Sequence, residues 1–389
     1  MTAPPKILFI DHSGQPGGGQ LGLERAWEQK LSAHSHVAFL TGGAVSERMA
    51  DRHPESVHIR RADPDFAPRR DLTLSLPWIL RLIRRVRPGI IVVNSAAAAK
   101  AVAPLIPLFS VPVVYYARTD LSKNSLKRWK RWLLTAATFR HFDAFIANSE
   151  WTRDTLPDVL RRRPVEIAYP VSGIQETAED RTAHVPSDGE TFLVVSLSRL
   201  EPWKGQEHLI RAVAQADAEL RRQGKTISLE LYGGTVLADQ QYIHHLESLA
   251  EELTAPVHFM GHVSDVSSVL DRAHALVLSS IQPEPFGQVV IQAMGHGVLT
   301  IVPDAGGPRE IITHEEDGLQ YPPGDAESLA SILVGMANDP ERHHQVASRG
   351  MQRATAFADS STTPGLEESI RRLWTRLTPP SSEGTRESA

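Results

Sequence analysis

The sequence predicts an α/β protein with two doubly wound parallel-sheet domains that face each other across a cleft. The chain has 389 residues, which is long for a single hydrophobic core. Runs rich in Val, Ile and Leu alternate with amphipathic segments along the chain, as expected when helices cover both faces of parallel sheets. The polar stretch "SGIQETAEDRTAHVPSDGE" interrupts the alternation at residues 172–190 and has the composition of a linker.

Ten strands are expected, five in each half of the chain. In the first half they lie at residues 6–11, 36–42, 89–95, 111–117 and 143–149. In the second half they lie at residues 191–198, 227–233, 257–261, 275–280 and 299–305. Amphipathic helices are expected between them, for example over residues 207–224 and 242–253. Each half is therefore expected to form one Rossmann-like domain, which binds ligands beyond the carboxyl ends of its strands.

Composition excludes several kinds of protein. A net charge of -5 gives no general case for binding nucleic acid. The chain has no cysteine, so it has no disulfide, thiolate metal site or cysteine nucleophile. Its first apolar run is too short for a signal peptide, and prolines, Asn94 and Lys100 interrupt the most apolar segment, residues 90–117. We therefore expect a soluble, cytoplasmic protein, and no spacing of His, Asp and Glu suggests a metal site.

Glycines follow the first strand in "DHSGQPGGGQLGLERA", residues 11–26. Gly18 and Gly19 would let the backbone approach a ligand closely, and the amide groups of the next helix could hold an anion. The spacing is not that of a dinucleotide-binding motif. The alternative is that the glycines only form a tight connection.

Two loops of the second half carry charged side chains. In "SLSRLEPWKGQEHLI", Arg199 and Lys204 emerge at the carboxyl end of a strand, and two cations there suit a diphosphate. In "PEPFGQVVIQAMGHG", Gly287 opens a helix whose amide groups could face a phosphate. The alternatives are a solvated basic pair in the first loop and a helix cap for Glu284 in the second.

The order of the motifs is more specific than any one of them. Five motifs follow one another, each at the end of an expected strand: "SRLEPWKG", "LYGG", "GHVSDV", "EPFG" with "VV", "QAM" and "HG", and "AGGPREII" with "DGLQYPPGD". This succession resembles the retaining glycosyltransferases of the large family-4 type, which have the GT-B fold. The resemblance covers essentially the whole chain and is most specific in residues 192–335. It implies a retaining, metal-independent hexosyltransferase that needs no cofactor beyond its nucleoside-diphosphate-sugar donor.

The resemblance also assigns roles to residues. It implies that Arg199 and Lys204 neutralise the diphosphate, and that Glu284 contacts hydroxyl groups of the transferred sugar. Backbone amides around Phe286 and Gly287 would help to hold the phosphates. The predicted catalytic residues are Arg118, Arg199, Lys204 and Glu284. The predicted donor-binding residues are Gly18, Gly19, Arg199, Lys204, Gly233, His262, Glu284, Phe286, Gly287, Gln288 and Gln292.

The chain departs from the family pattern at two positions. Gln292 stands where the family usually has an acidic residue that binds the ribose diol, which predicts weaker nucleotide binding by roughly 1–2 kcal/mol. A carboxylate restored by Gln292→Glu is expected to tighten that binding. Arg118 stands near the place of a family histidine, and it can stabilise charge but cannot act as a neutral base. Asp11, His12 and Asp120 are further polar candidates of a more structural type.

The resemblance further implies a division of the chain. Residues 1–172 would form the acceptor-side domain, 173–190 the linker and 191–362 the nucleotide-sugar domain. A helix over residues 363–378 would cross back to the N-terminal domain, and residues 379–389 would be a disordered tail.

One segment suggests a partner. Residues 122–142, "SKNSLKRWKRWLLTAATFRHF", combine basic side chains with Trp129 and Trp132, which suits the surface of an anionic membrane. The protein would then lie peripherally on the inner face of the membrane, with a lipid-linked or envelope glycan as acceptor. The alternative is a helix that packs its tryptophans on the sheet.

Two other functions are alternatives to a glycosyltransferase of polysaccharide or glycolipid synthesis. A non-catalytic partner protein that keeps the fold is suggested by Gln292 and by the missing histidine. A Rossmann-type oxidoreductase is disfavoured, because neither half has G-x-G-x-x-G followed by an acidic residue at the usual distance. The sequence does not predict which nucleotide base the donor carries, which sugar is transferred or which acceptor receives it.

Overall fold

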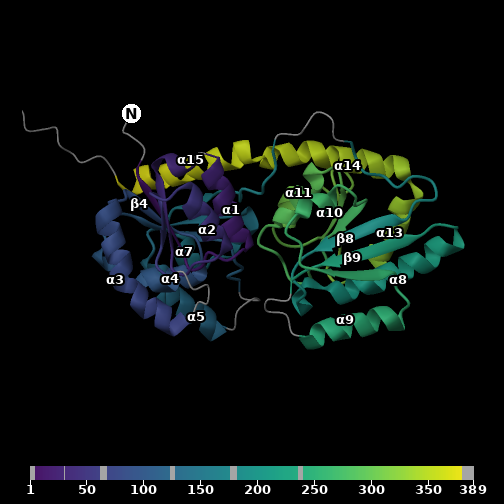
Figure 1. Cartoon of the computed structure of the whole chain (residues 1–389), viewed down its shortest axis with the longest axis horizontal. Coiled ribbons are helices and arrows are strands. Elements are labelled where there is room, and N and C mark those ends of the chain that lie inside the picture. Colours follow the sequence, from purple (N-terminus) through teal and green to yellow (C-terminus); the bar gives the residue numbers. More distant parts are fainter. Residues whose placement is uncertain are drawn as a thin grey trace, which may run out of the picture. The chain divides into compact units, whose positions relative to one another are not determined.

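The computed structural model describes residues 5–29, 31–61, 68–122, 128–175, 182–234 and 240–378. Contacts within the chain divide it into two compact units (Figure 1). Unit 1 consists of Met1–Val171 together with Ser360–Ala389, and unit 2 consists of Ser172–Asp359. The chain thus leaves unit 1 once and returns to it once.

Unit 1 contains a seven-stranded parallel sheet in the order β3-β2-β1-β4-β5-β6-β7. The strands are β1 (Ile7–Asp11), β2 (Ser35–Phe39), β3 (Val57–Ile59), β4 (Ile90–Val93), β5 (Val113–Ala117), β6 (Ala144–Ala147) and β7 (Val165–Ile167). The helices are α1 (Gly18–Glu28), α2 (Ala44–Arg52), α3 (Pro68–Val86), α4 (Ala96–Val102), α5 (Arg128–Ala137), α6 (Glu150–Thr155) and α7 (Asp158–Arg161).

Helices cover both faces of this sheet. On one face, side chains of α3 and α4 such as Ile79 and Val102 pack with the strands. On the other face, α1 and the last helix, α15 (Asp359–Leu377), supply Trp27 and Ile370 (Figure 1). Because both faces are buried, the strands have the continuously apolar character of the expected segments.

Helix α15 belongs to the core of unit 1 although it lies at the other end of the sequence. Leu366, Ile370 and Leu373 are at most 3% exposed and pack with strands β1, β2 and β4. Ser369 Oγ donates to the carbonyl oxygen of Ile167 at 3.2 Å. The returning chain therefore completes one face of the sheet.

Unit 2 contains a six-stranded parallel sheet in the order β10-β9-β8-β11-β12-β13. The strands are β8 (Phe192–Leu197), β9 (Ile227–Tyr232), β10 (Val257–Gly261), β11 (Ala275–Val277), β12 (Leu299–Pro303) and β13 (Leu319–Tyr321). The helices are α8 (Gln206–Arg222), α9 (Gln240–Glu252), α10 (Val266–Leu270), α11 (Gln288–Gly295), α12 (Pro308–Ile311), α13 (Ala326–Asn338) and α14 (Pro340–Ala354). One face packs against α8, α9 and α13, and the other against α10 and α11.

All ten expected strands are present, and the expected class of two doubly wound parallel sheets is confirmed. Strands β3, β7 and β13 were not expected. Each has three residues and only two apolar side chains or fewer, in "VHI", "VEI" and "LQY", so a continuous apolar run is lacking. All three lie at an edge of their sheet.

The strand order defines one special position in each sheet. In unit 1, β1 and β4 are neighbours, and the connections leave them in opposite directions along the sheet. In unit 2, β8 and β11 are related in the same way. Loops at the carboxyl ends of two such strands diverge, and open α/β sheets usually bind ligands there. No helix within the described residues is long and apolar enough to cross a membrane.

Candidate functional site

Lys204 and Glu284 meet at the carboxyl edge of the sheet in unit 2. Lys204 ends a short 3₁₀ turn, Pro202–Lys204, that follows β8, and Glu284 follows β11. The Lys204 Nζ atom lies 2.7 Å from Glu284 Oε1, and the two side chains are only 11% and 12% exposed. Ser280 Oγ also donates to Glu284 Oε1. The strand order therefore brings together two charged residues that are 80 positions apart.

Gly205 makes this meeting possible. Its φ of 68° lies in the left-handed region, and an added Cβ atom would stand 2.0 Å from the carbonyl oxygen of Ser279. Ser279 Oγ in turn donates to the carbonyl oxygen of Lys204 at 2.8 Å. A larger residue at position 205 would push the loop of Lys204 away from the loop of Glu284.

Helix α11 begins beside this ion pair. Its N-cap residue is Gly287, with φ of 100°, and no side chain caps the first turn. The backbone before it is fixed by the loop after β12, because the Gly307 N–H donates to the carbonyl oxygen of Glu284 at 2.8 Å. The Phe286 side chain is buried against Phe357, so only its backbone can face a ligand. Gln288 is the first helical residue, and these uncapped amide groups form a site suited to an anion.

Arg199 is placed differently from Lys204. It follows the same strand, but its side chain is 59% exposed and forms its ion pair with Glu201. Glu201 also accepts a hydrogen bond from the Trp203 indole nitrogen. The structure thus brings Lys204 to Glu284 and leaves Arg199 at the surface of the same loop.

Gly233 and His262 lie in the next loops of the same edge. Gly233 follows β9, and an added Cβ atom would stand 2.2 Å from the carbonyl oxygen of Ser198, beyond β8. The His262 ring, beyond β10, lies against Gly234, 3.4 Å from the position that a Cβ atom would take. These glycines allow the loops after three adjacent strands to pack closely.

Gln292 contacts the first residue of unit 2, Ser172. Its Nε2 atom donates to the carbonyl oxygen of Ser172 at 2.7 Å. The Gly173 N–H donates to Asp359 Oδ1 at 2.9 Å, and the Asp359 N–H donates to the carbonyl oxygen of Ile174 at 2.8 Å. These bonds join the segment at the start of unit 2 to the segment at its end. A carboxylate at position 292 could not make the bond to Ser172, because it has no donor.

A second polar cluster lies at the carboxyl edge of the sheet in unit 1. Asp11 ends β1 and is fully buried, with hydrogen bonds from the His12 backbone at 2.6 Å, Gln20 at 3.0 Å and Asn94 at 2.7 Å. Burial raises the pKa of Asp11, but hydrogen bonds from His12, Asn94 and Ser95 outweigh this effect, and the pKa lies below its ordinary value. Asp11 therefore stays ionised and fixes the residues around it.

Arg118 lies above the aromatic ring of Tyr116 in this cluster, with its guanidinium carbon 4.0 Å from the ring centroid. Gly19, in the first turn of α1, faces Arg118, whose Cδ is 3.6 Å from the position that a Cβ atom of Gly19 would take. Gly18 starts the same helix. Asp120 instead accepts hydrogen bonds from the backbone and the hydroxyl of Ser122, which gives it a role in a turn.

Supporting residues of these clusters were not predicted from the sequence, among them Ser280 and Asn94. Ser280 supports Glu284, and Asn94 supports Asp11. Both come at the ends of expected strands, residues 275–280 and 89–95, so the carboxyl-end rule could have found them. In the described part of the chain, no group of three or more His, Asp or Glu residues could hold a metal ion.

Helix α5 presents aromatic side chains to solvent. Trp129 is 60% exposed, Trp132 is 69% exposed and Leu133 is 48% exposed. The alternative in which this helix packs its tryptophans on the sheet is therefore wrong. Residues 123–127, part of the basic segment that suggested a membrane partner, lie outside the described residues.

The two halves of the chain match two protein families. Residues 24–171 match Glycosyltransferase Family 4, and residues 178–353 match Glycosyl transferases group 1. Alpha-1,3/1,6-mannosyltransferase alg-2 of Neurospora crassa is 24% identical over 283 residues, which are 63% of this chain and 58% of that protein. The lipopolysaccharide core biosynthesis glycosyltransferase LpsD of Rhizobium meliloti is 29% identical over 218 residues, 55% of this chain and 56% of that protein. Both matches span less than two thirds of the relative.

Solved structures match nearly the whole chain. HepE of Anabaena, crystallised with UDP and glucose, has a TM-score of 0.77 at 24% identity, covering 94% of this chain and 99% of that one. Sucrose-phosphate synthase of Thermosynechococcus elongatus has a TM-score of 0.75 at 20% identity, covering 95% and 99%. At these identities the likeness establishes the fold, and the expected GT-B fold is confirmed.

Proposed function

Because this chain consists of a Glycosyltransferase Family 4 domain followed by a group 1 glycosyl transferase domain, we propose that it transfers a sugar from a nucleoside-diphosphate sugar to a glycan, lipid-linked or small-molecule acceptor. The reaction would serve the synthesis of an envelope polysaccharide or glycolipid. The relatives in mannosyl transfer and lipopolysaccharide core synthesis support this class of product. The structures of HepE with UDP-glucose make UDP-glucose the first donor to test.

The observation that carries the proposal is the buried Lys204–Glu284 pair beside the uncapped start of α11. A buried ammonium group and helix amides that no side chain caps together suit a diphosphate. A carboxylate within reach of that diphosphate suits the hydroxyl groups of the attached sugar. Without donor, the two side chains neutralise each other. When a donor binds, its diphosphate would become the partner of Lys204, and Glu284 would turn to the sugar.

Retention would follow from attack on the same face as the leaving group. The bond between the anomeric carbon and the diphosphate oxygen breaks, and a bond to the acceptor oxygen forms. The proton of the acceptor hydroxyl passes to the departing diphosphate, so no protein base and no metal is required. Lys204, the exposed Arg199 and the amides of α11 would stabilise the charge that develops on the diphosphate. Unit 1 would supply acceptor contacts, with Arg118 as a candidate.

The first experiment measures thermal shifts against nucleoside diphosphates and their sugars, because a ligand that binds the folded state raises its stability. The best ligand is then titrated into variants. Lys204→Gln is expected to weaken nucleotide binding about tenfold or more, the usual effect of a lost hydrogen bond to a charged group. Glu284→Gln is expected to retain or tighten binding of the nucleoside diphosphate, since Lys204 loses its competing partner, while sugar transfer is lost.

Arg211→Gln is a matched control, because it removes an exposed cation of unit 2 that is paired with Glu207. It should change neither binding nor transfer. Absence of binding to every nucleotide tested would overturn the proposal. Nucleotide binding without transfer or donor hydrolysis would favour the alternative of a non-catalytic partner protein, which the engagement of Gln292 with Ser172 also supports.

The exposed side chains of α5 support a peripheral contact with an anionic membrane. Trp129, Trp132 and Leu133 offer the amphipathic and apolar groups that enter the interface of a bilayer. The double variant Trp129→Ala with Trp132→Ala is expected to lose co-sedimentation with phosphatidylglycerol vesicles. Leu108→Ala, which removes another exposed apolar side chain of unit 1, should keep it. Equal binding to phosphatidylcholine vesicles, or unchanged binding by the double variant, would contradict this contact.

A further inference from the structure

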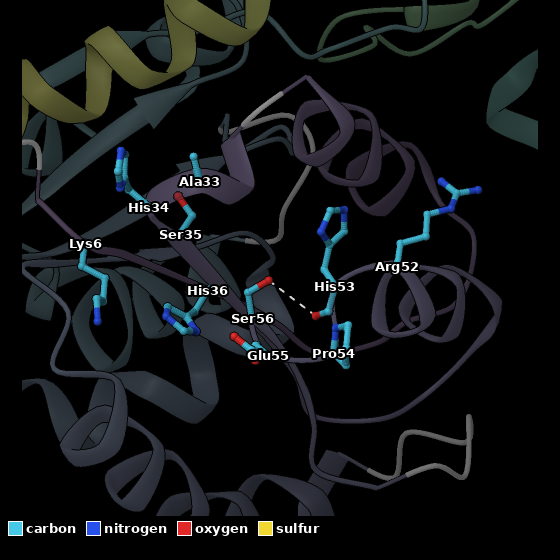
Figure 2. Close-up of a pocket in the computed structure, with 10 residues that line it drawn as sticks. All are labelled: Lys6, Ala33, His34, Ser35, His36, Arg52, His53, Pro54, Glu55 and Ser56. Atoms are coloured by element: carbon cyan, nitrogen blue, oxygen red, sulfur yellow. Dashed lines mark hydrogen bonds between the residues drawn. The ribbon is translucent and has the colours of Figure 1, made fainter.

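Unit 1 has a pocket whose lining contains none of the residues to which a role was assigned above. It has a volume of about 760 Å³, and its polar lining includes Lys6, His34, Ser35, His36, His53 and Ser56 (Figure 2). This volume falls within the usual range for small-molecule sites, roughly 300–1,000 Å³, and far exceeds what a simple inorganic ion would fill. The pocket therefore has room for a ligand of the size of a monosaccharide derivative.

The pocket is formed at the amino edge of the sheet. Lys6 immediately precedes β1, Ser35 and His36 begin β2, and Ser56 immediately precedes β3. These three strands are parallel neighbours, so their amino ends lie together. Asp11 ends β1 at the carboxyl edge, so the pocket is separate from the polar cluster around it. A ligand here would not occupy the acceptor or donor positions proposed above.

The fixed charges of the lining are two cations and one carboxylate. Lys6 is exposed, and it forms no ion pair with any residue that the structure describes. Arg52 lines the pocket but is paired with Glu28. Glu55 is the one carboxylate of the lining. Lys6 is thus the lysine or arginine of the lining that the described residues leave without an ion pair.

The imidazole groups add uncharged donors and acceptors. His36 Nδ1 lies 3.1 Å from His58 Nε2, so one ring donates to the other, and the rings are stacked with centroids 5.3 Å apart. Burial, Lys6 and Arg85 lower the pKa of His36. Burial, His36 and Arg85 lower the pKa of His58 to about 4. Both rings are therefore neutral at pH 7, mainly because burial disfavours their charged form.

We propose that this pocket binds a small phosphate monoester that carries hydroxyl groups, the chemical class of the sugar phosphates. Lys6 would take the phosphate as a point charge. The neutral His36 imidazole and the hydroxyls of Ser35 and Ser56 each donate and accept hydrogen bonds, as sugar hydroxyls require. The inference goes beyond the proposed function, because it concerns a different edge of a different unit from the donor residues.

Isothermal titration of the full chain with glucose 6-phosphate tests the proposal, with glucose and inorganic phosphate as the two halves of the probe. Glucose 6-phosphate should bind saturably, inorganic phosphate more weakly, and glucose below detection. Lys6→Gln should weaken binding about tenfold, as loss of a charge-assisted hydrogen bond does. Glu55→Gln should tighten binding about twofold to fivefold in low salt, because it removes an exposed like charge.

Lys100→Gln removes an exposed lysine of α4 and is the matched control, expected to bind as the unaltered chain does. UDP added in excess should not displace glucose 6-phosphate. Displacement by UDP would assign the probe to the proposed donor site and overturn the inference. No saturable binding, or an affinity unchanged by Lys6→Gln, would overturn it as well. Saturable binding and the effects of Lys6→Gln and Glu55→Gln can be measured whether or not the chain binds UDP or transfers sugar.

Discussion

His343 is a buried histidine with no part in the proposed site, and its burial links the stability of unit 2 to pH. Its side chain is 0% exposed, and its ring packs edge-on against Phe192 at 5.8 Å between centroids. Nε2 lies 3.1 Å from the carbonyl oxygen of His274. Burial lowers the pKa of His343 from 6.5 to about 4. The His343 ring therefore binds a proton near pH 6.5 in the unfolded chain, whereas in the folded unit it binds one only near pH 4.

The sign of the effect follows from linkage. Between pH 6.5 and about 4 the unfolded state binds more protons at this residue, so the free energy of unfolding falls as pH falls, by about 3 kcal/mol at most. In His343→Gln, whose amide can still donate to the carbonyl of His274, this loss should disappear. Urea unfolding at several pH values measures it. The exposed neighbour is the control, since His344→Gln should retain the full pH dependence; an unchanged profile in His343→Gln would contradict the assignment.

For single residues, the sequence predicted where a side chain lies in the fold better than which residue that side chain contacts. Lys204 and Glu284 could be identified because each follows a strand and carries a charge at an edge where ligands bind. The bond of Gln292 to Ser172 could not, because it joins residues 120 positions apart and depends on how the first residue of unit 2 lies against α11. Arg199 and Lys204 looked equivalent in the sequence, yet burial distinguishes them.

Secondary-structure elements were predictable where apolar runs are long. Strand β8 has six residues and was readily expected, whereas β13 has three residues and follows a loop rich in charge. The short edge strands are held by pairing with a neighbour rather than by their own pattern, so only the folded sheet defines them. Helix α11 was expected from its position after Gly287, and the left-handed backbone there is a feature that glycine permits.

Helix α11 gives a prediction at the scale of elements, because Gln292 ties it to the chain at Ser172. Gln292→Glu removes the donor and places a carboxylate against a carbonyl oxygen. At pH 7 this should destabilise unit 2 by about 1 kcal/mol, the low end of the penalty for an unsatisfied polar group, because position 292 is only partly buried. The loss should shrink near pH 4, since a protonated carboxyl can donate to Ser172 and its folded-state pKa is raised. Urea unfolding at both pH values, corrected by the unaltered chain, measures this.

Gln292→Ala is the companion variant, because it also loses the bond but cannot recover it by protonation. Its deficit relative to the unaltered chain should be the same at both pH values. If Gln292→Glu instead equals the unaltered chain at pH 7 and tightens nucleotide binding, position 292 acts on the ribose rather than on Ser172.

At the scale of the molecule, unit 2 is an insertion between two parts of unit 1. A chain cut after Asp359 keeps all of unit 2 and loses the buried Leu366, Ile370 and Leu373. Each such side chain contributes roughly 1.5–3 kcal/mol by burial, so unit 1 should unfold at much lower urea or fail to fold. Unit 2 should keep its own transition. Hydrogen exchange resolved by unit measures both.

A chain cut after Thr378 is the control, because it retains the whole of α15. Both transitions should then match those of the full chain. Equal stability of unit 1 in the two truncated chains would show that α15 does not complete its core.

The return of α15 also sets an order of events during translation. Domains of a nascent chain commonly fold in the order in which they leave the ribosome. Here residues 172–359 emerge complete while the earlier part of unit 1 still lacks the helix that covers one face of its sheet. Unit 2 can thus reach its native state first, and the earlier part of unit 1 keeps an apolar face open to chaperones until α15 has been translated.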